Sequence, residues 1–104
     1  MNLYSKKNII NLFKKYNIKP QKKLGQNFLI DKNIIKKIIR SSNISKNDIV
    51  LEIGPGIGTL TIELSKKVKK VIAIEKDKTI IKILKETTKG FKNIKIINQD
   101  ILKI

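Results

Sequence analysis

The feature that most constrains the fold is a short apolar run that leads directly into a glycine-rich segment. Residues 49–53 (Ile-Val-Leu-Glu-Ile) precede segment 54–58 (Gly-Pro-Gly-Ile-Gly), and apolar residues then recur every fourth position at Leu60, Leu64 and Val68. This order predicts a strand, a tight turn and a helix, because glycine readily adopts positive φ angles. The nearly continuous apolar character of the strand predicts burial on both of its faces.

The same alternation of strand and helix continues toward the C-terminus. The sequence predicts a strand over residues 71–74, a helix over 77–88 and a third strand over 94–97. Strands that alternate with helices of this length pair in parallel through right-handed crossovers. The predicted fold class is therefore α/β, with three parallel strands and their helices forming the N-terminal portion of a truncated Rossmann-like sheet.

Two helices are expected before the glycine-rich segment. Residues 6–17 place apolar side chains at helical spacing among lysines, which is typical of a helix packed on the domain and also of a basic arm that contacts RNA phosphates, and both can hold at once. Asp31 is a suitable N-cap for the next helix, whose apolar stripe is expected to be core: Ile34, Ile35, Ile38 and Ile39. We therefore divide the chain into an N-terminal segment, 1–47, with basic helices and a cofactor-contacting loop, and a first βαβαβ half, 48–104.

The charge balance predicts a polyanionic partner. The chain of 104 residues has 24 basic and 8 acidic residues and a net charge of +16, which favours nucleic acid over a membrane. An AT-rich genome would also enrich lysine, but it would not explain the shortage of acids. The sequence has no cysteine and no histidine, so we expect no disulfide, no zinc site and no Ser-His-Asp chemistry.

Three features are expected to meet beyond the carboxyl ends of the strands, where ligands bind in such sheets. The first is the glycine-rich segment, whose backbone can approach a ligand closely. The second is Glu75, at the offset from the glycines at which an acid accepts hydrogen bonds from ribose hydroxyls. The third is Asp100, which follows the third strand and is placed to accept from the exocyclic amine of a base. Together they predict a site for a nucleoside cofactor.

The spacing of the glycines indicates which cofactor. The dinucleotide fingerprint is G-x-G-x-x-G/A, whereas here the third glycine comes one residue early, at Gly58, and is followed by Thr59. This form suits a cofactor without a pyrophosphate, and so favours S-adenosyl-L-methionine over NAD. The sequence has no G-x-x-x-x-G-K-[ST] motif, which excludes a P-loop.

At this point the sequence resembles the ribosomal RNA adenine dimethyltransferases of the KsgA type. Segment 23–31 (Lys-Leu-Gly-Gln-Asn-Phe-Leu-Ile-Asp) is similar to the first motif of that family, and segment 52–61 is similar to its cofactor motif. Segments 73–77 and 98–102 resemble the next two motifs. Pro55 and the Thr-Leu-Thr of 59–61 favour this branch over the related methyltransferases that modify large-subunit RNA.

The resemblance implies a class I S-adenosylmethionine-dependent methyltransferase fold and an rRNA adenine N6,N6-dimethyltransferase that acts on two adjacent adenines of small-subunit rRNA. It assigns Asn27 and Leu29 to the methionine and adenosine side of the cofactor, and Gly54 and Gly56 to close backbone approach. It further assigns Glu75 to the ribose hydroxyls and Asp100 to the adenine amine. The basic N-terminal region would contact rRNA.

The sequence departs from the family pattern in one respect. No Asn-x-Pro-Tyr, the type of motif that presents the target base, occurs in the chain, so we assign no catalytic residue and expect the fragment alone to be inactive. A non-enzymatic RNA-binding or ribosome-assembly module therefore stays open as the alternative, and an NAD-binding Rossmann domain is disfavoured by Gly58. We expect no metal and a cytoplasmic location, or an organelle of bacterial origin; the oligomeric state stays open.

Overall fold

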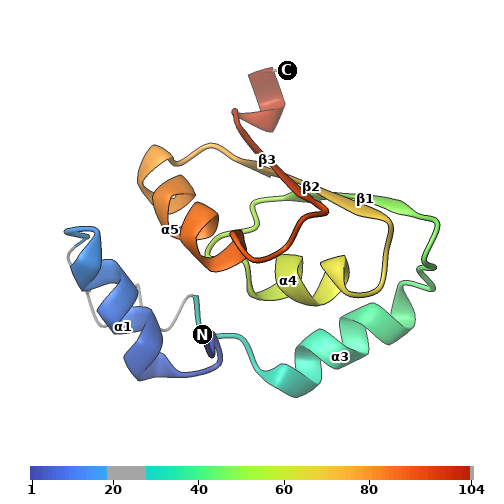
Figure 1. Cartoon of the computed structure of the whole chain (residues 1–104), viewed down its shortest axis with the longest axis horizontal. Helices are drawn as coiled ribbons and strands as arrows, with labels where there is room; N and C mark the ends of the chain where they lie inside the picture. The colour runs from blue at the N-terminus through green and yellow to red at the C-terminus, as the bar shows by residue number, and fades with distance from the viewer. Residues whose placement is uncertain (19–27, 104) are drawn as a thin grey trace.

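The computed structural model describes residues 1–18 and 28–103, and over these it shows a small three-stranded sheet with helices (Figure 1). In chain order the elements are α1 (Lys6–Lys15), α3 (Lys32–Ser41), β1 (Ile49–Ile53), α4 (Thr59–Ser65), β2 (Lys70–Glu75), α5 (Lys78–Thr88), β3 (Ile94–Asn98) and the short 3-10 helix η1 (Ile101–Lys103). The segment 19–27, which contains most of the first predicted motif, lies outside the described residues.

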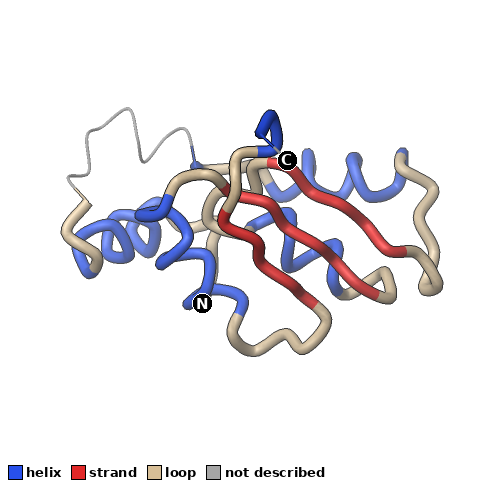
Figure 2. Tube along the Cα trace, turned by 90° about the horizontal axis from the view of Figure 1, so that it is seen from above, coloured by secondary structure: helices blue, strands red, loops and turns tan. Residues whose placement is uncertain are grey.

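The three strands form one parallel sheet in the order β1-β2-β3. Val50 lies opposite Val71, and Ala73 lies opposite Ile96. Helices α4 and α5 pack on the same face of this sheet, and Figure 2 shows the three strands running side by side toward η1. The predicted α/β class with parallel strands is confirmed. Because the strands are parallel, the carboxyl ends of all three lie at one edge of the sheet.

The prediction that the first strand is buried on both faces is wrong for this structure. Ile49, Leu51 and Ile53 are 60%, 55% and 58% exposed, whereas Val50 is half-buried. Successive side chains of a strand point to opposite faces, and the helices that the structure describes cover only one face of this sheet. In addition, β1 is an edge strand with no partner on its outer side among the described residues.

Two apolar clusters hold the helices to the sheet and to each other. In the first, α1 contributes Ile9 and Phe13, which are fully buried against Ile57 of the glycine turn and against Ile80 and Ile83 of α5. The second surrounds the start of β2 and contains Leu64, Val68 and Val71. Segments 1–47 and 48–104 therefore share a core, because α1 packs on elements of the second segment.

Helix α3 differs from its predicted packing. Of the four isoleucines expected in the core, only Ile35 is fully buried, whereas Ile34 and Ile38 are 54% and 42% exposed. The reason is that α3 packs on α4 along one flank, whereas no other helix or strand of the described residues packs on it to a similar extent. Asp31 does act as its N-cap, with its side chain accepting a hydrogen bond of 2.7 Å from the backbone N–H of Asn33.

Helix α4 is shorter than the spacing of its apolar residues predicts. It ends at Ser65, with Lys66 as the C-cap residue, and Val68 is buried in the connection that follows. The four-residue periodicity of Leu60, Leu64 and Val68 therefore continues past the last helical residue, because Val68 fills the second apolar cluster from a turn.

Candidate functional site

The glycine-rich segment forms a tight turn in which all three glycines have positive φ angles. The φ angles are +70° at Gly54, +59° at Gly56 and +95° at Gly58. Other residues are strained in this region, because their Cβ atom approaches the backbone. The turn is tied to the sheet by a hydrogen bond of 2.9 Å that the Gly54 N–H donates to the carbonyl of Ile74.

The surroundings of the glycines differ along the turn. A Cβ at Gly58 would lie 3.0 Å from atoms of both Leu84 and Thr87 on α5, so Gly58 permits close packing of the helix. A Cβ at Gly56 would lie 3.0 Å from the ring of Phe28. A Cβ at Gly54 would meet nothing within 4 Å, which leaves space beside this part of the backbone. Of the three glycines, Gly54 is therefore the one that leaves room for a ligand.

Glu75, at the end of β2, links the turn to the start of α5. Its side chain is buried, and its carboxylate accepts hydrogen bonds from the backbone N–H of Gly56 at 3.3 Å and of Asp77 at 3.1 Å. These bonds hold the carboxylate beside the glycine turn, at the carboxyl edge of the sheet. A carboxylate fixed in this way retains lone pairs that can accept hydrogen bonds from ligand hydroxyls.

A cavity of about 190 Å³ lies at this edge of the sheet, and three of the predicted site residues line it together. These are Gly54, Glu75 and Asp100, with Ile53 and Ile74 among the apolar lining. One carboxylate oxygen of Asp100 accepts a hydrogen bond of 3.0 Å from the N–H of Leu102 in η1. The structure therefore brings together the three features that the sequence predicts to meet.

The other predicted site residues are not in this group. Gly56 contacts Glu75 but does not line the cavity, and Leu29 is 38% exposed at a position before α3. Asn27 lies outside the described residues. The roles assigned to these residues, and to the three that line the cavity, stay predictions.

Glu52 is a further acid beside the turn that the sequence predictions do not single out. Its side chain projects from the helix-covered face of β1 and accepts a hydrogen bond from the hydroxyl of Thr61, which is fully buried in α4. Burial raises the pKa of the Glu52 carboxyl, and the hydrogen bond from Thr61 opposes that increase. The signal in the sequence is an acid within an apolar strand, where an unpaired carboxylate would be costly.

Within residues 1–18 and 28–103, no group of three or more acidic, cysteine or histidine side chains is arranged to hold a metal ion. The same part of the chain contains no helix that is long and apolar enough to cross a membrane.

Comparison with known proteins places this site in a family. The family model described as ribosomal RNA adenine dimethylase matches residues 17–104, which include the glycine turn, Glu75 and Asp100. The chain belongs to this family. The resemblance noted in the sequence is thereby confirmed.

Two curated relatives show how much of a family member the chain represents. It is 52% identical over 104 residues to the ribosomal RNA small subunit methyltransferase A of Natranaerobius thermophilus, covering all of this chain and 34% of the relative. It is 54% identical over 90 residues to the protein of the same name from Clostridioides difficile, covering 86% of this chain and 31% of the relative. The chain spans about one third of the length of these relatives.

Solved structures agree on the fold. The 23S rRNA methyltransferase ErmE is similar with a TM-score of 0.68 and 35% identity, over 72% of this chain and 31% of that chain. A dimethyladenosine transferase from Plasmodium falciparum is similar with a TM-score of 0.66 and 38% identity, over 71% of this chain and 28% of that chain. The fold is thus the N-terminal portion of a Rossmann-like S-adenosylmethionine-dependent methyltransferase fold.

Proposed function

We propose that this chain is the cofactor-binding N-terminal part of an rRNA adenine N6,N6-dimethyltransferase that acts on two adjacent adenines of small-subunit rRNA. The family match and the names of the curated relatives support this class of reaction. The observation that carries the proposal is the shared cavity of Gly54, Glu75 and Asp100 at the carboxyl edge of the sheet. Nucleoside ligands bind at this edge of open α/β sheets.

The residues present fit S-adenosyl-L-methionine. The open space beside Gly54 admits a ligand against the backbone, Glu75 offers acceptors for ribose hydroxyls, and Asp100 offers an acceptor for the adenine amine. The cavity of about 190 Å³ is smaller than the roughly 300 Å³ at which drug-sized ligand sites begin. It would therefore suit the adenosine part of the cofactor rather than the whole molecule.

The cofactor, when bound, supplies a methyl group on a sulfonium for direct transfer to an amine. This chain's contribution is to bind and orient that group, and positioning of the reactants is the main source of rate in such a transfer. We assign no catalytic residue among the described residues, and we expect the chain by itself to bind cofactor without methylating RNA.

Calorimetric titration of the chain with S-adenosyl-L-methionine and with NAD tests the proposal. We expect binding of the first and none of the second. Asp100→Asn is expected to weaken S-adenosyl-L-methionine binding by roughly tenfold, because it replaces a charged acceptor and adds an N–H donor toward the adenine amine. Asp48→Asn is a matched control, since Asp48 precedes β1 at the opposite edge of the sheet, where it accepts from the N–H of Ser45.

Equal loss of binding in both variants, or binding of NAD in preference, would contradict the proposal. Binding of neither cofactor together with salt-sensitive RNA binding would instead support the alternative function, a non-enzymatic RNA-binding or ribosome-assembly module. The observation that favours this alternative is the net charge of +16. A cytoplasmic location is part of the same proposal.

A further inference from the structure

A continuous groove runs between α3 and α4 on the outer side of the helical layer. Three adjoining cavities, of about 560, 410 and 400 Å³, share lining residues: Tyr4, Lys32 and Glu63 join the first two, and Arg40 and Lys67 join the first and third. At its Tyr4 end the groove is also lined by Thr59, the first residue of α4 after the glycine turn. We call this the α3–α4 groove.

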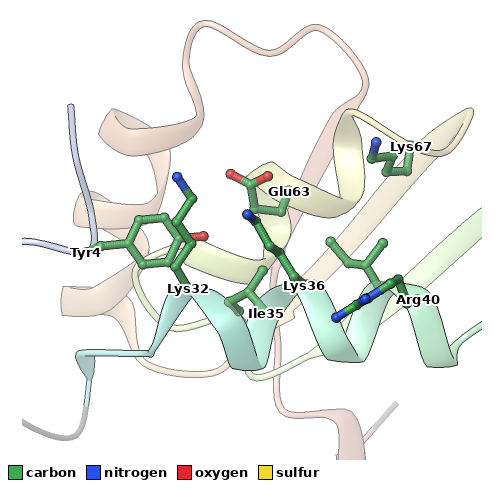
Figure 3. A pocket seen from close by; sticks show the side chains of 8 residues that line it. Tyr4, Lys32, Ile35, Lys36, Arg40, Glu63 and Lys67 are labelled. Atoms are coloured by element: carbon green, nitrogen blue, oxygen red, sulfur yellow. The ribbon is translucent and has the colours of Figure 1, made fainter.

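The walls of the α3–α4 groove are strongly basic. Lys32, Lys36 and Arg40 follow one another at four-residue intervals along α3, and Lys67 faces them from the turn after α4 (Figure 3). Residues at this spacing lie on one side of a helix, and the row extends over about 12 Å at 1.5 Å per residue. The only acid among the described lining residues is Glu63, which forms a salt bridge of 3.2 Å with Lys66.

These cations are available to a ligand. Lys32, Lys36, Arg40 and Lys67 are exposed, and within the described part of the chain none of them has an acidic partner within salt-bridge distance. The groove also has apolar and aromatic surface, since Ile35 lies in its floor and the ring of Tyr4 lies at one end, 5.9 Å from the Lys32 ammonium. Basic walls with an aromatic residue are the composition of surfaces that bind single-stranded nucleic acid.

The other basic segment of the N-terminal region is built differently. Helix α1 buries Ile9, Leu12 and Phe13 in the first apolar cluster, and its Lys15 pairs with Glu86 of α5. The small cavity beside it is lined by Lys15 and Glu86 together, so this lysine already has an acidic partner. The prediction that α1 packs on the domain is confirmed, whereas its contact with RNA phosphates, which can hold at the same time, stays a prediction.

We propose that the α3–α4 groove binds the phosphate backbone of a single-stranded RNA segment. This inference rests on the proposed function for its substrate class, and it adds a surface on this chain that contacts RNA away from the cofactor cavity. The cations along α3 neutralise successive phosphates, and the Tyr4 end of the groove adjoins Thr59, at the start of the helix that follows the glycine turn. Sequence-independent contact of this kind is carried by charge and is sensitive to salt.

The test is titration of the chain with a fluorescent oligouridylate over a series of salt concentrations. The Lys36→Glu/Arg40→Glu variant is compared with Lys82→Glu/Lys85→Glu, which makes the same change in net charge on exposed positions of α5 that line none of the three cavities. We expect the groove variant to lose at least about tenfold in affinity and the control less than about threefold. The groove variant should also flatten the dependence of log K on log salt by about 1.4, since each lost phosphate contributes about 0.7.

Equal losses in the two variants would overturn the assignment, because they would show a response to net charge alone. Competition by polyglutamate as effective as competition by RNA at equal charge would also overturn it, in favour of an acidic protein partner. The milder variant Lys36→Gln/Arg40→Gln, measured in the same way, removes the two charges without reversing them. It should also lose affinity, which would show that the loss does not come from a folding defect of the glutamate variant. Calorimetry with S-adenosyl-L-methionine separates this result from the proposed function, since groove variants should retain cofactor binding.

Discussion

The carboxyl group of Glu52 shows how one residue can link the sheet to the helix that follows the glycine turn. Its acceptor role toward the Thr61 hydroxyl satisfies a fully buried donor, while burial of the carboxyl itself favours the protonated form. The two effects act on the same side chain but in opposite directions. The hydrogen bond from Thr61 to Glu52 therefore stabilises the fold, whereas burial of the ionised carboxylate destabilises it.

This balance predicts a pH dependence of stability. Because burial raises the pKa of Glu52 in the folded state, the folded chain holds more protons than the unfolded chain between the ordinary carboxyl pKa and the raised one. The free energy of unfolding should therefore fall as pH rises through that window, and stay lower above it. Glu52→Gln keeps an acceptor for Thr61 and should remove this component, so that the variant is the more stable protein at neutral pH.

Urea unfolding of both proteins across a pH series measures the effect. The difference in the free energy of unfolding between Glu52→Gln and the unmodified chain should be larger near neutral pH than near pH 4, which is about the ordinary carboxyl pKa. Thr61→Val should destabilise the chain at every pH, because it removes the donor. Parallel pH profiles for Glu52→Gln and the unmodified chain would show that this carboxyl is not the cause.

Among the elements, α3 shows how far an apolar stripe predicts packing. Its four isoleucines have the spacing of a core-facing side, and the helix forms over Lys32–Ser41 as that spacing indicates. Periodicity specifies which residues share a side of a helix, but it does not specify how wide the neighbouring surface is. Here α4 covers one flank of α3, and Ile34 and Ile38 remain largely exposed.

Alanine substitutions along α3 therefore have unequal expected effects. Ile35→Ala should lower the free energy of unfolding by about 2–4 kcal/mol, because it leaves a cavity beneath the α3–α4 groove. Ile34→Ala should change it by no more than about 0.5 kcal/mol, as for most exposed positions. Denaturant unfolding followed by circular dichroism measures both. A loss at Ile34 as large as at Ile35 would mean that the stripe packs as the sequence alone suggests.

At the scale of the whole molecule, the described helices cover one face of the sheet and leave the other open. Ile49, Leu51 and Ile53 are exposed on the open face, and among the described residues the outer edge of β1 has no partner strand for its backbone groups. An apolar edge strand of this kind readily pairs with other chains. The net charge of +16 opposes self-association, but charge repulsion is screened by salt.

We therefore expect the 104-residue chain to associate as salt concentration rises. Leu51→Lys should increase the monomeric fraction, because it places a charge in the middle of the exposed apolar row on the edge strand β1. Ile34→Lys adds the same charge at an exposed isoleucine of α3 and should have less effect. Analytical ultracentrifugation at several salt concentrations measures both. A monodisperse monomer with cooperative melting for the unmodified chain would contradict this expectation.

The sequence by itself determined the order of the elements, their parallel pairing and the residues at the carboxyl edge of the sheet. These follow from local chemistry: alternation of strand and helix periods, three glycines with positive φ, and acids placed where strands end. Gly54, Glu75 and Asp100 were predicted for this reason and do share one cavity. The family resemblance, carried by contiguous motifs, was readable in the same way.

Only the tertiary structure decided what covers each surface. Whether β1 is buried, which isoleucines of α3 are core and how α1 packs on α5 depend on neighbours that are distant in sequence. The same holds for the α3–α4 groove, whose cations come from α3 and from the turn after α4. The physical reason is that burial and charge clustering depend on which surfaces meet in space. The periodicity of apolar residues, in contrast, indicates only the type of a single element and which of its residues share a side.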